Sequence, residues 1–290
     1  MVQGKIEKVQ FKPKESVEKL KNIGLKNVYH MPLVTDTYYA SGLVISNEDE
    51  KKYSHDISFI GQMYCNDMKK DMGKYYPSEY VDKVRDIFEN ETCDWHDYNK
   101  LYNLLNKDII DAFYTKNIGH GNPVFDEGLF YNEVFRNVAY YERVKVLNAL
   151  AEKYKVDIYT KGDTGELKNV NIHGVVHSTE VAPKIFHLSK INLNVTIHCI
   201  RTGAPLRIFD IMGVGGFVLS NYQEELAELF VEDKEIVLFK DIDEMIDKAG
   251  YYLTHEKARA QIAINGYKRV SKDYNYIVGL EKILKLSGVE

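Results

Sequence analysis

The stretch INLNVTIHCIRTGAPLRIFDIMGVGGFVLS, residues 191–220, decides the fold. It opens with an apolar strand pattern, passes through a loop that contains Gly203, and continues as a helix whose first turn holds Pro205. A second strand pattern follows at residues 216–220. A strand, a helix and another strand in this order predict two parallel strands joined by a right-handed crossover.

The same alternation extends on both sides of this stretch. Strand patterns occupy residues 56–61, 156–159, 170–174 and 236–239, and helical patterns occupy residues 181–188, 205–212, 224–230 and 242–253. Residues 255–287 are helical in pattern, with an expected break at Gly266. The whole predicts an α/β fold with a Rossmann-like, mostly parallel sheet and helices on both faces.

Two domains of unequal size are expected, 1–52 and 53–290. The first holds one helix–strand step and then, from residue 36, a polar, turn-rich stretch typical of a linker. The second begins near Tyr53 and contains a helical, aromatic-rich stretch, whose part at about 66–141 we interpret as an insertion. The short first part predicts a remnant of a lobe, because an independent lobe needs on the order of 100 residues.

Residues 201–216 combine the features of an anion-binding loop. Gly203 lets backbone N–H groups approach a ligand, and the positive end of the following helix dipole lies at the carboxyl edge of the sheet. Arg207 and Asp210 share one face of that helix. Arg207 is suited to neutralise a diphosphate, and Asp210 to accept hydrogen bonds from two ribose hydroxyls. An intrahelical salt bridge between them is the alternative.

A family resemblance rests on these residues. The string SKINLNVTIHCIRTGAPLRIFDIMGVGGFVLSNYQEELAELF, residues 189–230, resembles the glycosyltransferase C-terminal domain of CgeB-like proteins. DISFIGQMY at residues 56–64 and NVYHMPLVTD at residues 27–36 are also similar to that family. The resemblance covers about residues 20–290 and implies the C-terminal, donor-binding lobe of a GT-B glycosyltransferase, a group 1 family protein.

The resemblance implies roles for the loop and helix. It places the donor ribose on Asp210 and the diphosphate near Gly203 and Arg207. Eight positions before Asp210, where retaining relatives often carry an acidic residue, this chain has Thr202. The stereochemical outcome therefore stays open, and Arg201 is a candidate second ligand for phosphate or sugar.

Three further donor contacts follow from their places in the fold that the resemblance implies. Gly61 ends the first strand of the second domain and is expected to bring a loop toward the phosphates. Thr160 and Gly174 follow the next two strands and are expected beside the nucleotide base. For the neighbouring Gly162, a plain turn is the favoured interpretation.

Histidines are the candidates for the base that deprotonates an acceptor. His120 lies in the loop sequence GHGN between helices, where flanking glycines suit a ligand-facing position. A surface or packing role is the alternative for it. His173, His177 and His198 flank strand ends and can line the same cleft, although the sequence indicates no partner for any of them.

We expect no bound metal and no cofactor. The pattern Asp241–Ile242–Asp243 resembles an Asp-x-Asp metal motif, but it follows a strand and opens a helix, and Asp241 with Glu244 forms a capping box. The resemblance likewise implies that helix dipole and basic side chains stabilise the leaving diphosphate. Aromatic residues such as Tyr76 and Trp95 in the insertion are expected in the core.

Composition excludes several classes of protein. The 290 residues carry a formal net charge of −5, so no global basic field is available to bind nucleic acid. No apolar run approaches the length of a membrane span, and the three cysteines are widely spaced. A cytoplasmic protein is expected.

Two functions of different classes follow. The first is a glycosyltransferase that moves a sugar from a nucleoside-diphosphate donor, with a UDP-sugar favoured, to a hydroxyl of a protein or glycan. Family context suggests a surface acceptor such as spore coat, flagellin or cell-envelope glycan. The second is a non-catalytic nucleotide-sugar-binding or interaction module, and a sugar-nucleotide epimerase is a third possibility. The short N-terminal part has two explanations: either the chain begins late in a longer, truncated enzyme, or the helical insertion takes over the acceptor side.

Overall fold

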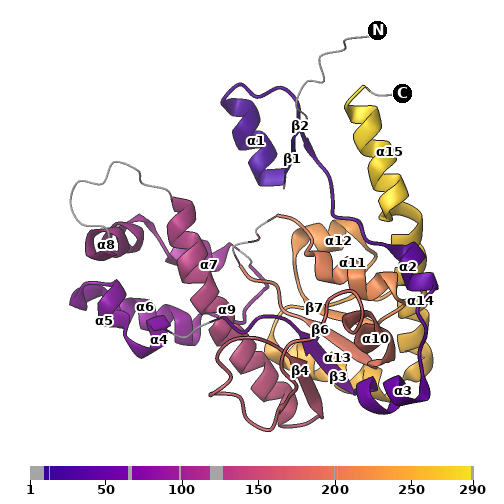
Figure 1. Ribbon diagram of the computed structural model, residues 1–290. Coiled ribbons are helices and arrows are strands. Elements are labelled where there is room, and N and C mark those ends of the chain that lie inside the picture. Colours follow the sequence, from indigo (N-terminus) through magenta and orange to yellow (C-terminus); the bar gives the residue numbers. More distant parts are fainter. Residues whose placement is uncertain are drawn as a thin grey trace.

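The computed structural model describes residues 10–12, 14–64, 67–97, 99–117, 127–198, 200 and 202–288. Within them, the centre is a parallel sheet of six strands in the order β5-β4-β3-β6-β7-β8 (Figure 1). Its strands are β3 (Ile57–Ile60), β4 (Val156–Tyr159), β5 (Asn171–Ile172), β6 (Ile191–Asn194), β7 (Val218–Asn221) and β8 (Val237–Phe239). The expected Rossmann-like parallel sheet is confirmed.

Helices cover both faces of this sheet. Helix α10 (Ala182–Leu188) and helix α11 (Leu206–Gly213) contact each other and pack on β3, β6 and β7. On the other face, α9 (Glu127–Ala151) and α13 (Ile242–Thr254) contact each other and pack on β4, β6 and β8. The remaining helices of this half are α12 (Glu224–Leu229), α14 (Glu256–Asp273) and α15 (Tyr276–Leu286).

A helical segment lies beside the sheet, before and around α9 (Figure 1). It comprises α4 (Asp67–Lys70), α5 (Met72–Tyr75), α6 (Ser78–Asn90), α7 (Lys100–Leu104) and α8 (Lys107–Asn117). Its aromatic residues are core, as expected: Tyr76 and Trp95 are fully buried. The Trp95 ring meets Phe239 of β8 edge-on at 5.3 Å, and its backbone N–H donates to the Lys240 carbonyl. The segment is thereby fixed to the edge strand of the sheet.

The N-terminal part contains a small two-stranded sheet of its own. Strands β1 (Gln10–Lys12) and β2 (Val28–His30) pair in parallel around α1 (Lys14–Asn22). The stretch from residue 36, expected as a bare linker, contains two short helices, α2 (Thr37–Ser41) and α3 (Asn47–Tyr53). A capping box between Ser46 and Asp49 starts α3, and the Asp49 carboxylate also binds Lys184 of α10. These polar residues therefore cap and anchor a helix.

One expected helix boundary is wrong. Gly266 does not break a helix, since α14 runs through it and ends before Asn275, the N-cap of α15. A Cβ at Gly266 would lie 2.7 Å from the Glu235 carbonyl oxygen. The glycine is needed for close packing of α14. Helix α9 runs through Tyr141 to Ala151, in agreement with the helical pattern of the sequence there, and the limits of the insertion stay a prediction.

Two smaller expectations can be tested in the described residues. Asp241 caps α13 by accepting from the Glu244 N–H, so the N-cap is confirmed, but the box is not reciprocal, because the Glu244 carboxylate accepts from the Lys240 N–H. Among these same residues, no helix is both long enough and apolar enough to cross a bilayer.

The close packing at Gly266 gives a test of stability. We expect Gly266→Ala to lower the free energy of unfolding by ~1–3 kcal/mol, because the new methyl group collides with a backbone carbonyl. The matched control is Gly250→Ala in α13, where the methyl group meets only the movable side chain of Tyr154. Helix propensity offsets that contact, so this variant stays within ~1 kcal/mol of the native chain. Equal urea midpoints for the two variants would contradict the packing argument.

Candidate donor site at the carboxyl edge of the sheet

A cavity lies where β3 and β4 end and where the chain leaves β5. Its described lining residues are Ile60, Gly61, Gln62, Tyr159, Thr160, Lys161, Val175, Val176, Ser178, Ala182 and Arg207. Parallel strands deliver these positions to one edge, where ligands bind in open α/β sheets. Gly61 and Thr160, both expected from the sequence, line it, and the expected strand end at 174–176 contributes Val175 and Val176, although Gly174 itself is not among the lining residues.

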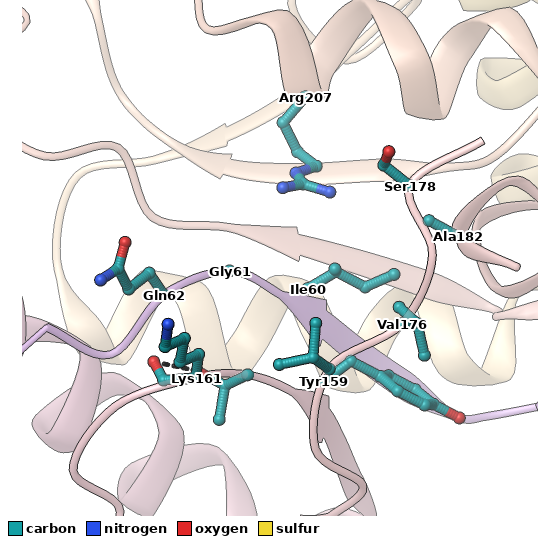
Figure 2. A pocket seen from close by; sticks show the side chains of 11 residues that line it. Ile60, Gly61, Gln62, Tyr159, Lys161, Val176, Ser178, Ala182 and Arg207 are labelled. Carbon is teal, nitrogen blue, oxygen red and sulfur yellow. Dashed lines mark hydrogen bonds between the residues drawn. The ribbon is translucent and has the colours of Figure 1, made fainter.

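Arg207 is the positive charge of this cavity. Its side chain extends from α11 toward the loop of Gly61 and Gln62 (Figure 2). The guanidinium also lies 5.5 Å from the centre of the Phe186 ring. Burial lowers the pKa of Arg207, and the nearby Asp210 carboxylate opposes that shift. A half-buried guanidinium of this kind gains most by binding an anion.

Asp210 lines a neighbouring cavity that shares Ser178 with the first. Its Oδ1 accepts a hydrogen bond of 2.8 Å from the Thr35 hydroxyl, which comes from the segment after β2. The two cavities have volumes of about 210 and 350 Å³, so the first falls below the ~300–1,000 Å³ typical of ligand pockets and the second lies at the lower end of that range. Together they suit a ligand with two chemically different parts. In the described structure Arg207 and Asp210 are not joined by the expected alternative of an intrahelical salt bridge, although their opposite charges attract each other.

The remaining expected residues of the loop are placed less centrally. Gly203 has φ +121°, a left-handed conformation that favours glycine, and lies in the loop before α11. Thr202 belongs to the same loop and is half-buried. Arg201 and His120 lie outside the described residues.

Arg143, which sequence reasoning missed, supports the floor of the cavity. Its guanidinium is buried and donates to the Gln62 carbonyl and, at 2.8 Å, to the Val195 carbonyl. It also lies 4.9 Å from the centre of the Tyr64 ring. Burial lowers its pKa, and the positive charge of Arg207 adds to that effect. The sequence gives no clear signal for such a residue, because Arg143 stands between Glu142 and Lys145 in a helix with several other polar residues.

Histidines expected near the cleft have partners that the sequence did not indicate. His198, at the end of β6, is buried with its Nδ1 3.1 Å from Oε2 of Glu142, itself fully buried. His173 pairs with Asp157 on β4. Both imidazoles are therefore held in place by carboxylates, and neither is among the residues that line the Arg207 cavity.

The fold is that of the GT-B glycosyltransferases, seen in solved structures that are 11–12% identical to this chain. HepE from Anabaena in complex with UDP and glucose aligns with a TM-score of 0.56, covering 97% of this chain and 63% of HepE. A TarM variant from S. aureus, in complex with fondaparinux, alpha-GlcNAc-glycerol and UDP, aligns with a TM-score of 0.51, covering 94% and 42%. The chain thus spans less than two thirds of the length of either structure.

A family model supports the same class over part of the chain. Residues 142–285, from α9 to α15, match the family described as glycosyl transferase-like. This range contains Arg143, Arg207 and Asp210 and most of the cavity lining. No curated protein is significantly similar in sequence. The narrower CgeB-like subtype stays a prediction.

The Thr35–Asp210 hydrogen bond gives a pH-dependent prediction. Burial raises the pKa of Asp210 above its ordinary value of 3.8, against the opposing effects of the Thr35 hydroxyl and Arg207. The folded state thus binds the proton of the Asp210 carboxyl group more tightly than the unfolded state does. The stabilisation of the folded state by this proton is fully present below the ordinary pKa and is lost as pH rises through the raised pKa. Thr35→Val removes the donor and raises that pKa further.

We therefore expect the stability of Thr35→Val to keep falling to a higher pH than that of the native chain. Urea unfolding between pH 4 and 8 measures this. Thr37→Val is the matched control, because it removes a hydroxyl from the same segment and leaves the Thr35–Asp210 bond in place. Asp210→Asn should remove this pH dependence of stability both in the native chain and in the Thr35→Val variant. Identical pH profiles for Thr35→Val and Thr37→Val would refute the role of the Thr35–Asp210 hydrogen bond.

Proposed function

We propose that this chain binds a nucleoside-diphosphate sugar, with a UDP-sugar as the favoured donor, and transfers the sugar to an acceptor hydroxyl. The observation that carries the proposal is the cavity in which Arg207 faces the Gly61 loop at the carboxyl edge of the sheet (Figure 2). The UDP complexes of HepE and of the TarM variant support uridine diphosphate as the first nucleotide to test.

The donor would span the two cavities. The diphosphate would lie between Arg207, the Gly61 loop and the amino end of α11, where unpaired N–H groups and the helix dipole favour negative charge. The base would lie against Tyr159 and Thr160. The ribose would reach past Ser178, which lines both cavities, toward Asp210 in the second one.

In the transfer step, the bond between sugar and diphosphate breaks and negative charge grows on the leaving oxygen. Arg207 and the amino end of α11 would stabilise that charge without a bound metal ion. No carboxylate or imidazole is found among the described residues that line the Arg207 cavity. The base for the acceptor would therefore come from another part of the enzyme, with His120 as the candidate in this chain. The CgeB-like resemblance favours a surface protein or glycan as the acceptor.

The same lining supports a second candidate, a module that binds a nucleotide sugar without transferring it. A cavity with a phosphate-binding arginine but, among its described residues, without a base suits binding alone. Release of free sugar or glycosylated product from a radiolabelled UDP-sugar would favour the transferase. Binding without turnover by the full chain would favour the module.

Arg207→Met tests the donor site. The variant keeps most of the side-chain volume and removes the charge, so we expect UDP affinity to fall ~10- to 100-fold, as for a lost charge-assisted hydrogen bond. The matched control is Arg85→Met on α6, an arginine paired with Asp82 in the helical segment, which should leave UDP affinity unchanged. Isothermal titration calorimetry with UDP, GDP, dTDP and CDP measures both and identifies the base.

Equal UDP affinity for the two arginine variants would remove Arg207 from the site. Absence of binding by the native chain to all four nucleotides, at millimolar concentration, would reject the donor proposal. Circular dichroism of each variant checks that the fold is retained.

A further inference from the structure

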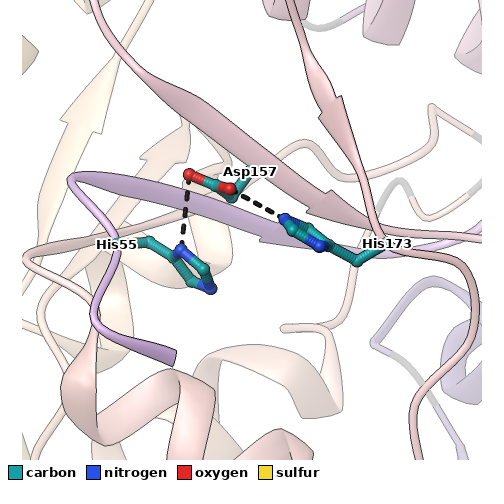
Figure 3. A group of neighbouring side chains, drawn as sticks. All are labelled: His55, Asp157 and His173. Atoms are coloured by element: carbon teal, nitrogen blue, oxygen red, sulfur yellow. Dashed lines mark hydrogen bonds and ion pairs between the residues drawn. The ribbon is translucent and has the colours of Figure 1, made fainter. Parts of the chain in front are cut away.

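A compact group of metal-ligating side chains lies on the sheet beneath the donor cavity, outside the residues proposed for transfer. It consists of His55, just before β3, Asp157 on β4, and His173, just after β5 (Figure 3). His173 Nε2 lies 2.7 Å from Asp157 Oδ1, and His55 Nδ1 lies 3.3 Å from Asp157 Oδ2. One ligand atom from each of the three residues lies within 4.8 Å of the other two.

The strand register brings these residues together. Asp157 pairs with Asn171, so the next residues on the same face of the two strands are Tyr159 and His173. The rings of Tyr159 and His173 stack at 4.8 Å. Strands β3 and β4 pair from Ile57 and Val156 onward, so the residues just before β3 lie beside the start of β4. His55 belongs to these residues, and its ring reaches Asp157.

Asp157 is a buried carboxylate with one oxygen incompletely satisfied. Oδ1 accepts hydrogen bonds from His173 and, at 3.2 Å, from Asn171. Oδ2 is fully covered and makes no hydrogen bond within the described structure, since the His55 contact has the distance of an ion pair without hydrogen-bond geometry. A buried carboxylate oxygen in this state is costly unless a cation neutralises it.

The ligand set indicates which cation fits. Two imidazole nitrogens and one carboxylate suit zinc or a neighbouring transition-metal ion better than magnesium or calcium, which prefer oxygen ligands. Zinc bonds of ~2.0–2.2 Å place tetrahedral ligand atoms ~3.4 Å apart. The His55–Asp157 separation of 3.3 Å already matches this, whereas His173 Nε2 and Asp157 Oδ1, at 2.7 Å, would have to move slightly apart to admit an ion. His55 has the outer partner typical of a metal ligand, because its Nε2 lies 2.9 Å from the Tyr159 hydroxyl.

We infer that His55, Asp157 and His173 form a binding site for one divalent transition-metal ion, zinc in the first place. This differs from the sequence-based expectation of no metal, which was argued from the Asp241 pattern and from the way the family resemblance implies that the diphosphate is stabilised. The ion would hold His55 in the tautomer that donates from Nε2 to Tyr159. Since Tyr159 also lines the donor cavity, the ion would orient one wall of that cavity without taking part in sugar transfer. The inference does not depend on the proposed function.

The test uses the full chain after treatment with a chelator. We expect the native protein to bind one equivalent of Zn²⁺ by calorimetry, with micromolar or tighter affinity, and to give a visible d–d absorption with Co²⁺. His173→Gln should lose at least tenfold in affinity. Its side chain is partly exposed, so the fold should tolerate the change, and thermal unfolding without metal checks this.

The matched control is His96→Gln. His96 also has two carboxylate neighbours, but Asp94 faces its Nδ1 and Asp241 faces its Nε2, so the three cannot chelate one ion. Zinc should raise the unfolding temperature of the native chain and of His96→Gln, but not that of His173→Gln. Binding weaker than millimolar, or equal affinity in His173→Gln and native protein, would overturn the inference.

Discussion

The parallel direction of the strands in the six-stranded sheet is the constraint on which the candidate site depends. It brings the ends of β3, β4 and β5 to one edge, so residues as far apart as Gly61, Thr160 and Val176 meet in one cavity. The crossover helix α11 then begins at the same edge and supplies Arg207. In an antiparallel sheet, neighbouring strands would end at opposite edges, and the residues that line the cavity would no longer lie together.

That edge carries an unusual concentration of positive charge for an interior. Arg143 is buried behind the Gly61 loop and Arg207 extends in front of it. Arg143 is tolerated because two backbone carbonyls and an aromatic face surround its guanidinium. The carbonyls at Gln62 and Val195 come from the ends of β3 and β6, so the same contacts that stabilise the charge hold two strand ends together.

The sequence predicts the sheet well because its evidence is local. Strand and helix patterns between residues 156 and 253 recur with the right spacing, and each element needs only its own residues to be recognised. Helix boundaries are harder, as Gly266 illustrates: a glycine that ends a helix and one that admits a neighbouring backbone look alike in a sequence. Only the position of the Glu235 carbonyl tells them apart.

Within the candidate site, Arg207, Gly61 and Thr160 were predictable because a glycine-rich loop, a helix start and strand ends are sequence features. The pairings of Asp210 with Thr35 and of Asp157 with His55 were not, since they join residues 175 and 102 positions apart. Long-range partners of this kind are set by the register of the sheet and by the path of the N-terminal segment. A single sequence does not encode them as a pattern.

The position of Trp95 makes the molecule easy to observe. It is the sole tryptophan of the chain, and its ring is buried against Phe239, where the helical segment meets β8. Indole emission shifts to the red when water reaches the ring, so fluorescence excited at the red edge of indole absorption reports on that one junction. Separation of the helical segment from the sheet would therefore shift the Trp95 emission to the red, and this shift could be observed apart from the unfolding of the sheet.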